Sequence, residues 1–183
     1  MKDNQHNIFQ VPIWGFILTE HKYQSADYIE CLDRIKDTEP SARKSNFGGY
    51  QTRDNLNDTE PVLKEWISAV ENIGNNILKE YNSSKVRMTE LWGNINDKYC
   101  YNGAHIHGGI LSGVFYLQTP PNSGNLVFVN PAVRSDGHLL RAKNFTVQPE
   151  PLALIIFPSW LEHYVESNLS DQRRISLSFN LGV

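Results

Sequence analysis

Three of the six histidines in the chain stand at positions from which they could share one metal ion. His105 and His107 are separated by one residue in a stretch with strand composition, and His163 follows the apolar segment 154–157. Residues i and i+2 of a strand point to the same face, so the first two imidazoles could bind one ion. Imidazole suits iron, zinc, copper and nickel, and the pattern therefore does not name the metal. A hydrogen-bonded or solvated pair on a strand is the alternative interpretation.

A second polar pattern begins eleven residues after His163, where residues 174–180 read RISLSFN. The alternation predicts a strand with Arg174 and Ser176 on a polar face and with Ile175 and Leu177 facing a core. A guanidinium fork and a nearby hydroxyl can bind a carboxylate, which would make this face part of a ligand site. A strand face exposed to water is the alternative.

The elements that must position these residues follow a simple order, with helices first and strands afterwards. Ser25 can cap a helix that ends near Pro40, and a second helix is predicted to begin at residues 59–61, where a threonine, an acid and a proline meet. The apolar positions of both segments recur at helical spacing, which indicates that each helix buries one face. These positions are Ala26, Ile29, Leu32 and Ile35 in the first, and Leu63, Trp66, Ile67, Val70, Ile73, Ile77 and Tyr81 in the second.

Short segments rich in β-branched and aromatic residues fill the chain from Val86 onward. They predict about eight strands, with a further short one at 164–166, and turn residues at 120–124, 130–131 and 135–137 separate some of them. The strands are expected at residues 87–94, 99–106, 111–118, 125–130, 138–141, 145–148, 152–157 and 174–180. This order predicts an α+β protein that is mostly β and has sandwich or barrel character.

Length and composition limit the function classes. The chain has 183 residues, 40% of them apolar and 20% charged, which fits one ordinary domain. A net charge of −3 without any block of like charge argues against a general nucleic-acid or membrane-surface binder. The apolar stretch 11–18 is too short for a signal core or a membrane span, so we expect a cytoplasmic protein. Two cysteines, Cys31 and Cys100, are too few for a disulfide framework or a four-thiolate zinc site.

Taken in order, several segments resemble the Fe(II)/2-oxoglutarate-dependent oxygenases. The resemblance is greatest to a prolyl-4-hydroxylase-like branch of largely uncharacterised bacterial and phage proteins, which implies expression in a bacterial host. The segments are HIH at 105–107, SGVFYL at 112–117, SGNLVF at 123–128, FPSWLEHYV at 157–165 and RISLSFN at 174–180. Segments 9–14 and 45–51 also resemble that branch, so the likeness covers nearly the whole chain.

The resemblance implies a double-stranded β-helix, or jelly roll, with N-terminal helices packed on one sheet and a metal inside one open end. It implies a single 2-oxoglutarate/Fe(II) oxygenase domain over residues 1–183. Within it, residues 1–85 would form a helical support region and residues 86–183 the jelly-roll core.

For the metal site, the resemblance assigns Fe(II) to His105 and His163. His107 stands where most members of the wider superfamily have aspartate or glutamate. We expect His107 to be the third ligand, as in some cupin dioxygenases, and a water in its place is the alternative. Three neutral imidazoles would leave the site one negative charge short of the usual set.

For the cosubstrate, the resemblance assigns the distal carboxylate of 2-oxoglutarate to Arg174, helped by Ser176. Arg173 lies on the opposite face of the predicted strand and is the less favoured choice. Tyr101 and Tyr116 are candidates for a hydroxyl that contacts the cosubstrate. Tyr101 shares a face with His105 if the strand is regular, and aromatic core packing is its alternative. For Tyr116 the alternative is that the side chain faces away from the site. No catalytic residue is expected beyond the metal ligands.

The function implied is hydroxylation of a protein or peptide side chain or of a small metabolite, with Fe(II), 2-oxoglutarate and O2. Two other hypotheses remain open: a three-histidine cupin-type dioxygenase that needs no 2-oxoglutarate, and a non-catalytic jelly-roll protein with a binding or structural role. Segments 45–56 and 133–138 are candidates for substrate recognition, because both are rich in polar and glycine residues. No nucleic acid or membrane partner is expected, and an oligomer is possible.

Overall fold

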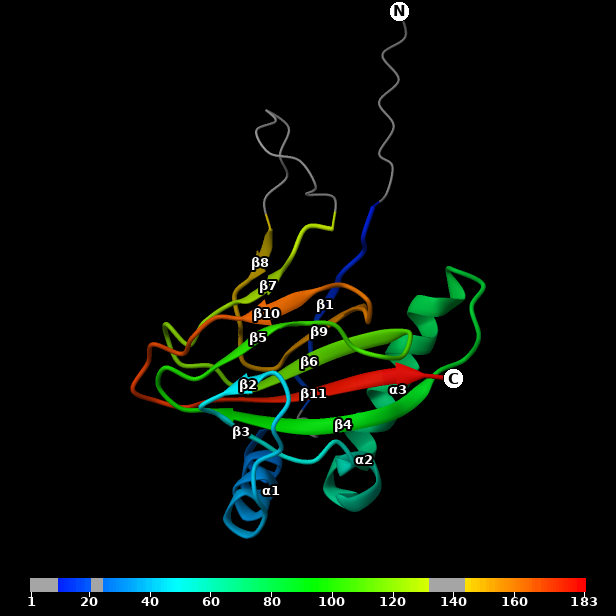
Figure 1. Ribbon diagram of the computed structural model, residues 1–183. Helices are drawn as coiled ribbons and strands as arrows, with labels where there is room; N and C mark the ends of the chain where they lie inside the picture. The colour runs from blue at the N-terminus through cyan, green and yellow to red at the C-terminus, as the bar shows by residue number, and fades with distance from the viewer. Residues whose placement is uncertain (1–9, 21–24, 132–143) are drawn as a thin grey trace, which may run out of the picture.

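The computed structural model describes residues 10–20, 25–131 and 144–183. Helices and short strands occupy the first half of the chain, and strands make up the second (Figure 1). In chain order the elements are β1 (Trp14–Ile17), α1 (Ser25–Thr38), β2 (Asn46–Phe47), β3 (Tyr50–Gln51), α2 (Leu56–Thr59), the 3-10 helix η2 (Pro61–Leu63), α3 (Lys64–Lys79), β4 (Arg87–Asn96), β5 (Tyr101–His105), β6 (Leu111–Gln118), β7 (Leu126–Phe128), β8 (Phe145–Val147), β9 (Ala153–Pro158), β10 (His163–Val165) and β11 (Arg174–Gly182).

The strands form two antiparallel sheets that face each other. The larger has the order β1-β9-β6-β11-β4-β3 and the smaller the order β2-β5-β10-β7-β8. Strands distant in sequence are neighbours, and β11 at the end of the chain lies between β4 and β6. The mostly β, jelly-roll fold with helices on one sheet is therefore confirmed.

Successive side chains of β11 point to opposite faces of the sheet, which lie in two different environments. Ile175, Leu177 and Phe179 are fully buried on the face that the helices cover. Arg174 and Ser176 lie on the other face, which looks toward the smaller sheet. Because β11 is paired along both edges, its register aligns the same two faces of β4 and β6.

Helices α1 and α3 cover the outer face of the larger sheet (Figure 1). Trp66 of α3 is fully buried there, with its ring centre 5.5 Å from that of Phe115 and 5.7 Å from that of Phe179. Both helices were predicted from their apolar spacing. The second begins with η2, because Pro61 opens a tighter first turn, and it ends before Tyr81, which is 56% exposed.

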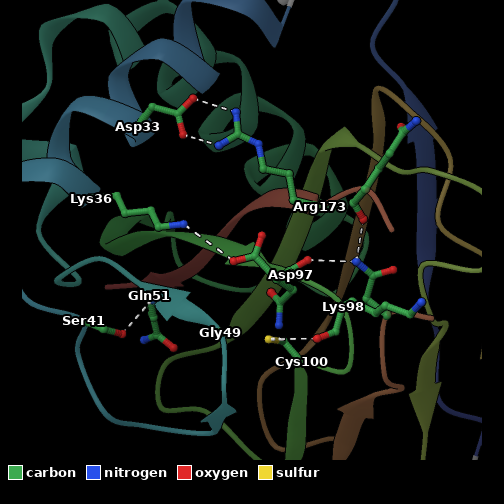
Figure 2. Close-up of polar contacts among 12 residues, drawn as sticks. Asp33, Lys36, Ser41, Gly49, Gln51, Asp97, Lys98, Cys100 and Arg173 are labelled. Atoms are coloured by element: carbon green, nitrogen blue, oxygen red, sulfur yellow. Dashed lines mark hydrogen bonds and ion pairs between the residues drawn. The ribbon is translucent and has the colours of Figure 1, made fainter. Parts of the chain in front are cut away.

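Ion pairs bind α1 to the ends of two sheet strands, as Figure 2 shows. Arg173, next to the start of β11, places Nη1 2.5 Å and Nη2 2.7 Å from the two carboxylate oxygens of Asp33. Lys36 Nζ lies 3.7 Å from an oxygen of Asp97, which follows β4. Arg173 therefore points to the helix layer, away from the space between the sheets.

The N-terminal half also contributes three strands that sequence analysis did not predict. β1 pairs with β9, β2 with β5 and β3 with β4. With lengths of four, two and two residues, they are too short to show a period-2 pattern. The division between residues 1–85 and 86–183 stays a prediction, and the strand expected at 138–141 lies outside the described residues.

Within the described ranges, no helix is both long and apolar enough to cross a membrane.

We predict that Gly113→Ala destabilises the protein by about 1 to 3 kcal/mol, because it overpacks a filled core. A Cβ at Gly113 would lie 2.3 Å from Cζ of Phe179 and 2.7 Å from the carbonyl oxygen of Ile155. Gly108→Ala is the matched control, since a Cβ there meets nothing within 4 Å, and its effect should stay within about 0.5 kcal/mol. Urea denaturation measures both variants, and equal stabilities would contradict the packing described here.

Candidate metal and cosubstrate site

A cavity of about 520 Å³ lies between the two sheets. The larger sheet lines it with residues of β4, β6, β9 and β11, and the smaller sheet with residues of β2, β5, β7 and β10. One part of the wall is apolar, with Val114, Leu126, Phe157 and Val165, and another carries the polar face of β11. The cavity therefore combines groups that bind a polar ligand with a wall that limits access of water.

The structure brings the three predicted histidines together at this cavity. His105 ends β5, His163 begins β10, and the two are register partners across the smaller sheet. His107 follows two residues after β5, and its backbone N–H donates to the Ser159 carbonyl at 2.9 Å. The ring nitrogens that could bind a metal all lie within 4.8 Å of one another. Such a cluster matches the nitrogen ligand set of a transition metal.

Backbone carbonyls orient two of the three rings. Nδ1 of His105 lies 2.7 Å from the Gly103 oxygen, and Nδ1 of His163 lies 2.9 Å from the Leu161 oxygen. The tautomer that donates its proton from Nδ1 keeps a lone pair on Nε2, which is how protein groups commonly orient histidine ligands. Both rings are thus held in a form that can bind a metal.

Burial keeps the three rings neutral. Burial, together with a smaller effect of the neighbouring histidines, lowers the pKa of His107 to about 3 and that of His163 to about 4. The pKa of His105 is lowered by the same burial, although its hydrogen bond to Gly103 opposes the shift. Because a metal binds neutral imidazole, the site needs to lose no proton at neutral pH.

Arg174 lies in the cavity wall and is only 2% exposed. Its Nη1 donates a short hydrogen bond to the carbonyl of Ser123 and lies 3.4 Å from the carbonyls of Gly124 and Glu166. Among the described residues its Nε and Nη2 have no hydrogen-bond partner. Burial lowers the pKa of Arg174, yet a guanidinium stays charged at neutral pH, so two donors remain for an anion.

Two further predicted residues lie beside Arg174. Ser176 and Tyr116 are register partners on β11 and β6, both line the cavity, and both are buried. Burial raises the pKa of Tyr116 to about 12, while the charge of Arg174 opposes the shift. The phenol is therefore protonated and can donate a hydrogen bond.

The structure does not bring Tyr101 to the cavity. Its ring stacks on Phe47 with centres 4.7 Å apart, and the side chain is 38% exposed. Phe47 lines the cavity and lies against Gly103, where a Cβ would meet its ring at 2.9 Å. The inserted ring separates Tyr101 from His105, although strand alternation predicts that they share a face.

Sequence analysis missed two asparagines on β4. Asn94 and Asn96 line the cavity and are register partners of Ser176 and Arg174. The Asn94 side-chain oxygen and the Asn96 side-chain nitrogen are buried without a hydrogen-bond partner in the described part of the chain. Such atoms are costly unless a ligand or water satisfies them, which fits a polar ligand beside Arg174. The two asparagines alternate with Gly93 and Ile95 in residues 92–96, and this period of two is the signal that could have identified them.

The chain is similar to known proteins in sequence and in fold. Residues 90–180 match the family model described as "Putative 2OG-Fe(II) oxygenase". A search of curated proteins gave no match.

Solved structures of similar shape include a prolyl-4-hydroxylase from Pseudomonas putida, at 15% identity and a TM-score of 0.67, over 93% of this chain and 92% of that one. A viral collagen prolyl hydroxylase from Paramecium Bursaria Chlorella virus-1 is similar at 13% identity and a TM-score of 0.66, over 93% and 96% of the two chains. HygX from Streptomyces hygroscopicus, solved with nickel and 2-oxoglutarate, has 14% identity and a TM-score of 0.64, over 94% and 83%. These likenesses show the same fold.

We predict that the metal-free protein loses stability as the pH falls below 6.5. The folded protein holds the pKa of His107 near 3, below the ordinary value of 6.5, so the unfolded chain binds more protons between these values. The contribution of this histidine to the free energy of unfolding is complete above pH 6.5 and decreases toward pH 3. Melting temperatures in the presence of a chelator, compared at pH 7.5 and pH 5, should therefore fall less in His107→Gln than in wild type. Equal losses in the two proteins would contradict the neutral, buried state of this ring.

Proposed function

Since the chain belongs to the 2OG-Fe(II) oxygenases, we propose that His105, His107 and His163 bind its Fe(II) and that Arg174 binds its 2-oxoglutarate. The protein is a 2-oxoglutarate-dependent oxygenase, with Fe(II), 2-oxoglutarate and O2 as its cofactor and cosubstrates. One observation carries the assignment of the metal: three neutral imidazoles converge within 4.8 Å at the cavity.

His107 is proposed as a ligand on the same ground as the other two. Its ring centre lies 4.7 Å from that of His105 and 5.0 Å from that of His163. The ring of Trp92 lies 5.4 Å from it on another side and restricts its movement. No carboxylate joins this cluster within the described ranges, so His107 takes the place of the acidic ligand of the wider superfamily.

The polar wall around Arg174 is proposed to hold 2-oxoglutarate. The two free donors of the guanidinium match the distal carboxylate, and the hydroxyls of Ser176 and Tyr116 can donate to the same anion. Asn94 and Asn96 offer an acceptor and a donor that otherwise remain unsatisfied. These contacts would orient the cosubstrate between the arginine and the histidines.

Bound iron would supply the oxygen chemistry, and the chain's residues would supply position and exclusion of water. The backbone carbonyls of Gly103 and Leu161 fix two imidazoles in the ligating tautomer. Buried Arg174 holds one end of the oxo acid in a low-dielectric wall, where the charge pair is stronger than in water.

For the substrate, we propose a peptide side chain or a small molecule. Among the similar structures are two prolyl hydroxylases and a HygX complex with hygromycin B. Segment 45–56, which was expected to recognise substrate, supplies Phe47, Gln51 and Asp54 to the cavity wall. The segment expected at 133–138 lies outside the described residues.

Substitution of the histidines tests the metal assignment. His105→Ala and His163→Ala should each abolish stoichiometric Fe(II) binding, because two remaining ligands leave the ion under-coordinated. His107→Asp should retain iron, whereas His107→Ala should weaken its binding. Metal analysis after anaerobic loading measures all four variants, and iron contents equal to wild type in the three alanine variants would refute the assignment.

Substitution of the two arginines tests the cosubstrate assignment. Arg174→Ala should raise the apparent 2-oxoglutarate constant about ten- to a hundredfold, the equivalent of roughly 1.5 to 3 kcal/mol for a charged hydrogen bond, without changing the iron content. Arg173→Ala removes the same charge from the helix-facing side and should change the constant little. Succinate formation at increasing 2-oxoglutarate concentration decides between them, and similar constants in both variants would contradict the proposal.

A further inference from the structure

Glu90 places an unpaired carboxylate in the cavity wall. In the described part of the chain, two acidic residues line the cavity, Glu90 and Asp54. Asp54 lies 3.7 Å from Nζ of Lys44, which also lines the cavity. No ion pair connects Glu90 to any described residue, so its charge is available to a ligand.

Buried polar residues hold one oxygen of this carboxylate in place. The side-chain nitrogen of Asn180 donates a short hydrogen bond to Oε2 of Glu90. Ser112 Oγ donates to the side-chain oxygen of Asn180 at 2.7 Å and lies 2.9 Å from Oγ of Ser159. Asn180, Ser112 and Ser159 are each at most 2% exposed. This network fixes the carboxylate while Oε1 has no hydrogen-bond partner among the described residues.

The carboxylate lies toward the histidines and away from Arg174. Glu90 pairs in register with Asn180, and Asn180 is six residues beyond Arg174 on β11. Trp92 lies two residues from Glu90 on β4, also lines the cavity, and has its ring centre 5.4 Å from that of His107. Glu90 is not a member of the histidine cluster, so it lines the same cavity without joining that cluster.

The opposite sheet adds an aromatic ring to the same lining. Phe47 of β2 lines the cavity and is 51% exposed, and the ring of Tyr101 stacks on one of its faces. An aromatic face attracts cations, and the attraction increases when the site is partly shielded from water. The fixed carboxylate of Glu90 favours a positively charged ligand group, and an aromatic ring elsewhere in the lining of the same cavity does not oppose one.

We propose that Glu90 binds a cationic group of the substrate, an alkylammonium or guanidinium, and so places the carbon atoms next to that group at the histidine end of the cavity. The inference rests on the proposed function and adds a substrate class to it. Arg174 does not compete for Glu90, because the proposed function pairs that guanidinium with the cosubstrate at the other end of β11.

Binding of short peptides tests this inference. The probes are acetyl-Gly-Gly-X-Gly-Gly-amides in which X is lysine, arginine, norleucine, glutamine or glutamate. Titration calorimetry under anaerobic conditions, with Fe(II) and 2-oxoglutarate present, should show the lysine or arginine peptide binding about ten- to a hundredfold more tightly than the norleucine peptide. Glu90→Gln should abolish this preference, while Asp54→Asn, the matched loss of a cavity carboxylate, should keep it.

Three results would overturn the inference: no preference for a cationic peptide in wild type, a preference unchanged in Glu90→Gln, or a loss of iron affinity in Glu90→Gln as large as its loss of peptide affinity. The last result would mean that Glu90 balances the charge of the metal. Failure of the proposed function would be seen separately, as an absence of succinate formation by the wild type. Cation-selective binding by a protein whose histidine-to-alanine variants keep their iron would support the Glu90 site and refute the metal assignment.

Discussion

The alternation of side chains along β11 is the constraint on which the rest of the structure depends. Ile175, Leu177 and Phe179 are fully buried under the helices, which forces Arg174 and Ser176 to the opposite face. A shift of one residue would expose the apolar set and remove the arginine from the cavity. Since β4 pairs with one edge of β11 and β6 with the other, the polar side chains of all three strands are turned to the same side. Core packing thus determines where the residues proposed to bind the cosubstrate lie.

Burial gives this cavity its chemical character. It keeps the histidines uncharged and places Arg174 where water competes poorly for its charge. A metal ion and a dianionic oxo acid can satisfy such a site, because the positive charges of the metal ion and of the arginine balance the negative charges of the oxo acid. The Glu90 carboxylate adds a negative charge to the lining of the same cavity, whereas the three proposed metal ligands carry none. The proposed roles therefore follow from where the charges lie, with positive Arg174 near one end of β11 and negative Glu90 near the other.

Sequence patterns predicted much of this arrangement, and the misses have physical reasons. The two long helices and the faces of Arg174 and Arg173 follow from regular periods of 3.6 and 2. The short strands β1, β2 and β3 acquire their conformation from pairing with strands distant in sequence, so their own residues carry little signal. The ring of Tyr101 stacks on that of Phe47, and the period of a single strand cannot predict a contact with a residue of another strand. Asn94 and Asn96 could be recognised as residues of the cavity only from their pairing with β11, which places them there.

The most direct test of the account is a crystal structure of the protein grown without oxygen and soaked with Mn(II) and 2-oxoglutarate. Anomalous scattering locates the manganese independently of the protein coordinates. We predict one peak bound by Nε2 of His105 and His163 and by a ring nitrogen of His107, with the far carboxylate of the oxo acid on Arg174. A peak away from these imidazoles, or an oxo acid whose far carboxylate lies on other residues, would contradict it.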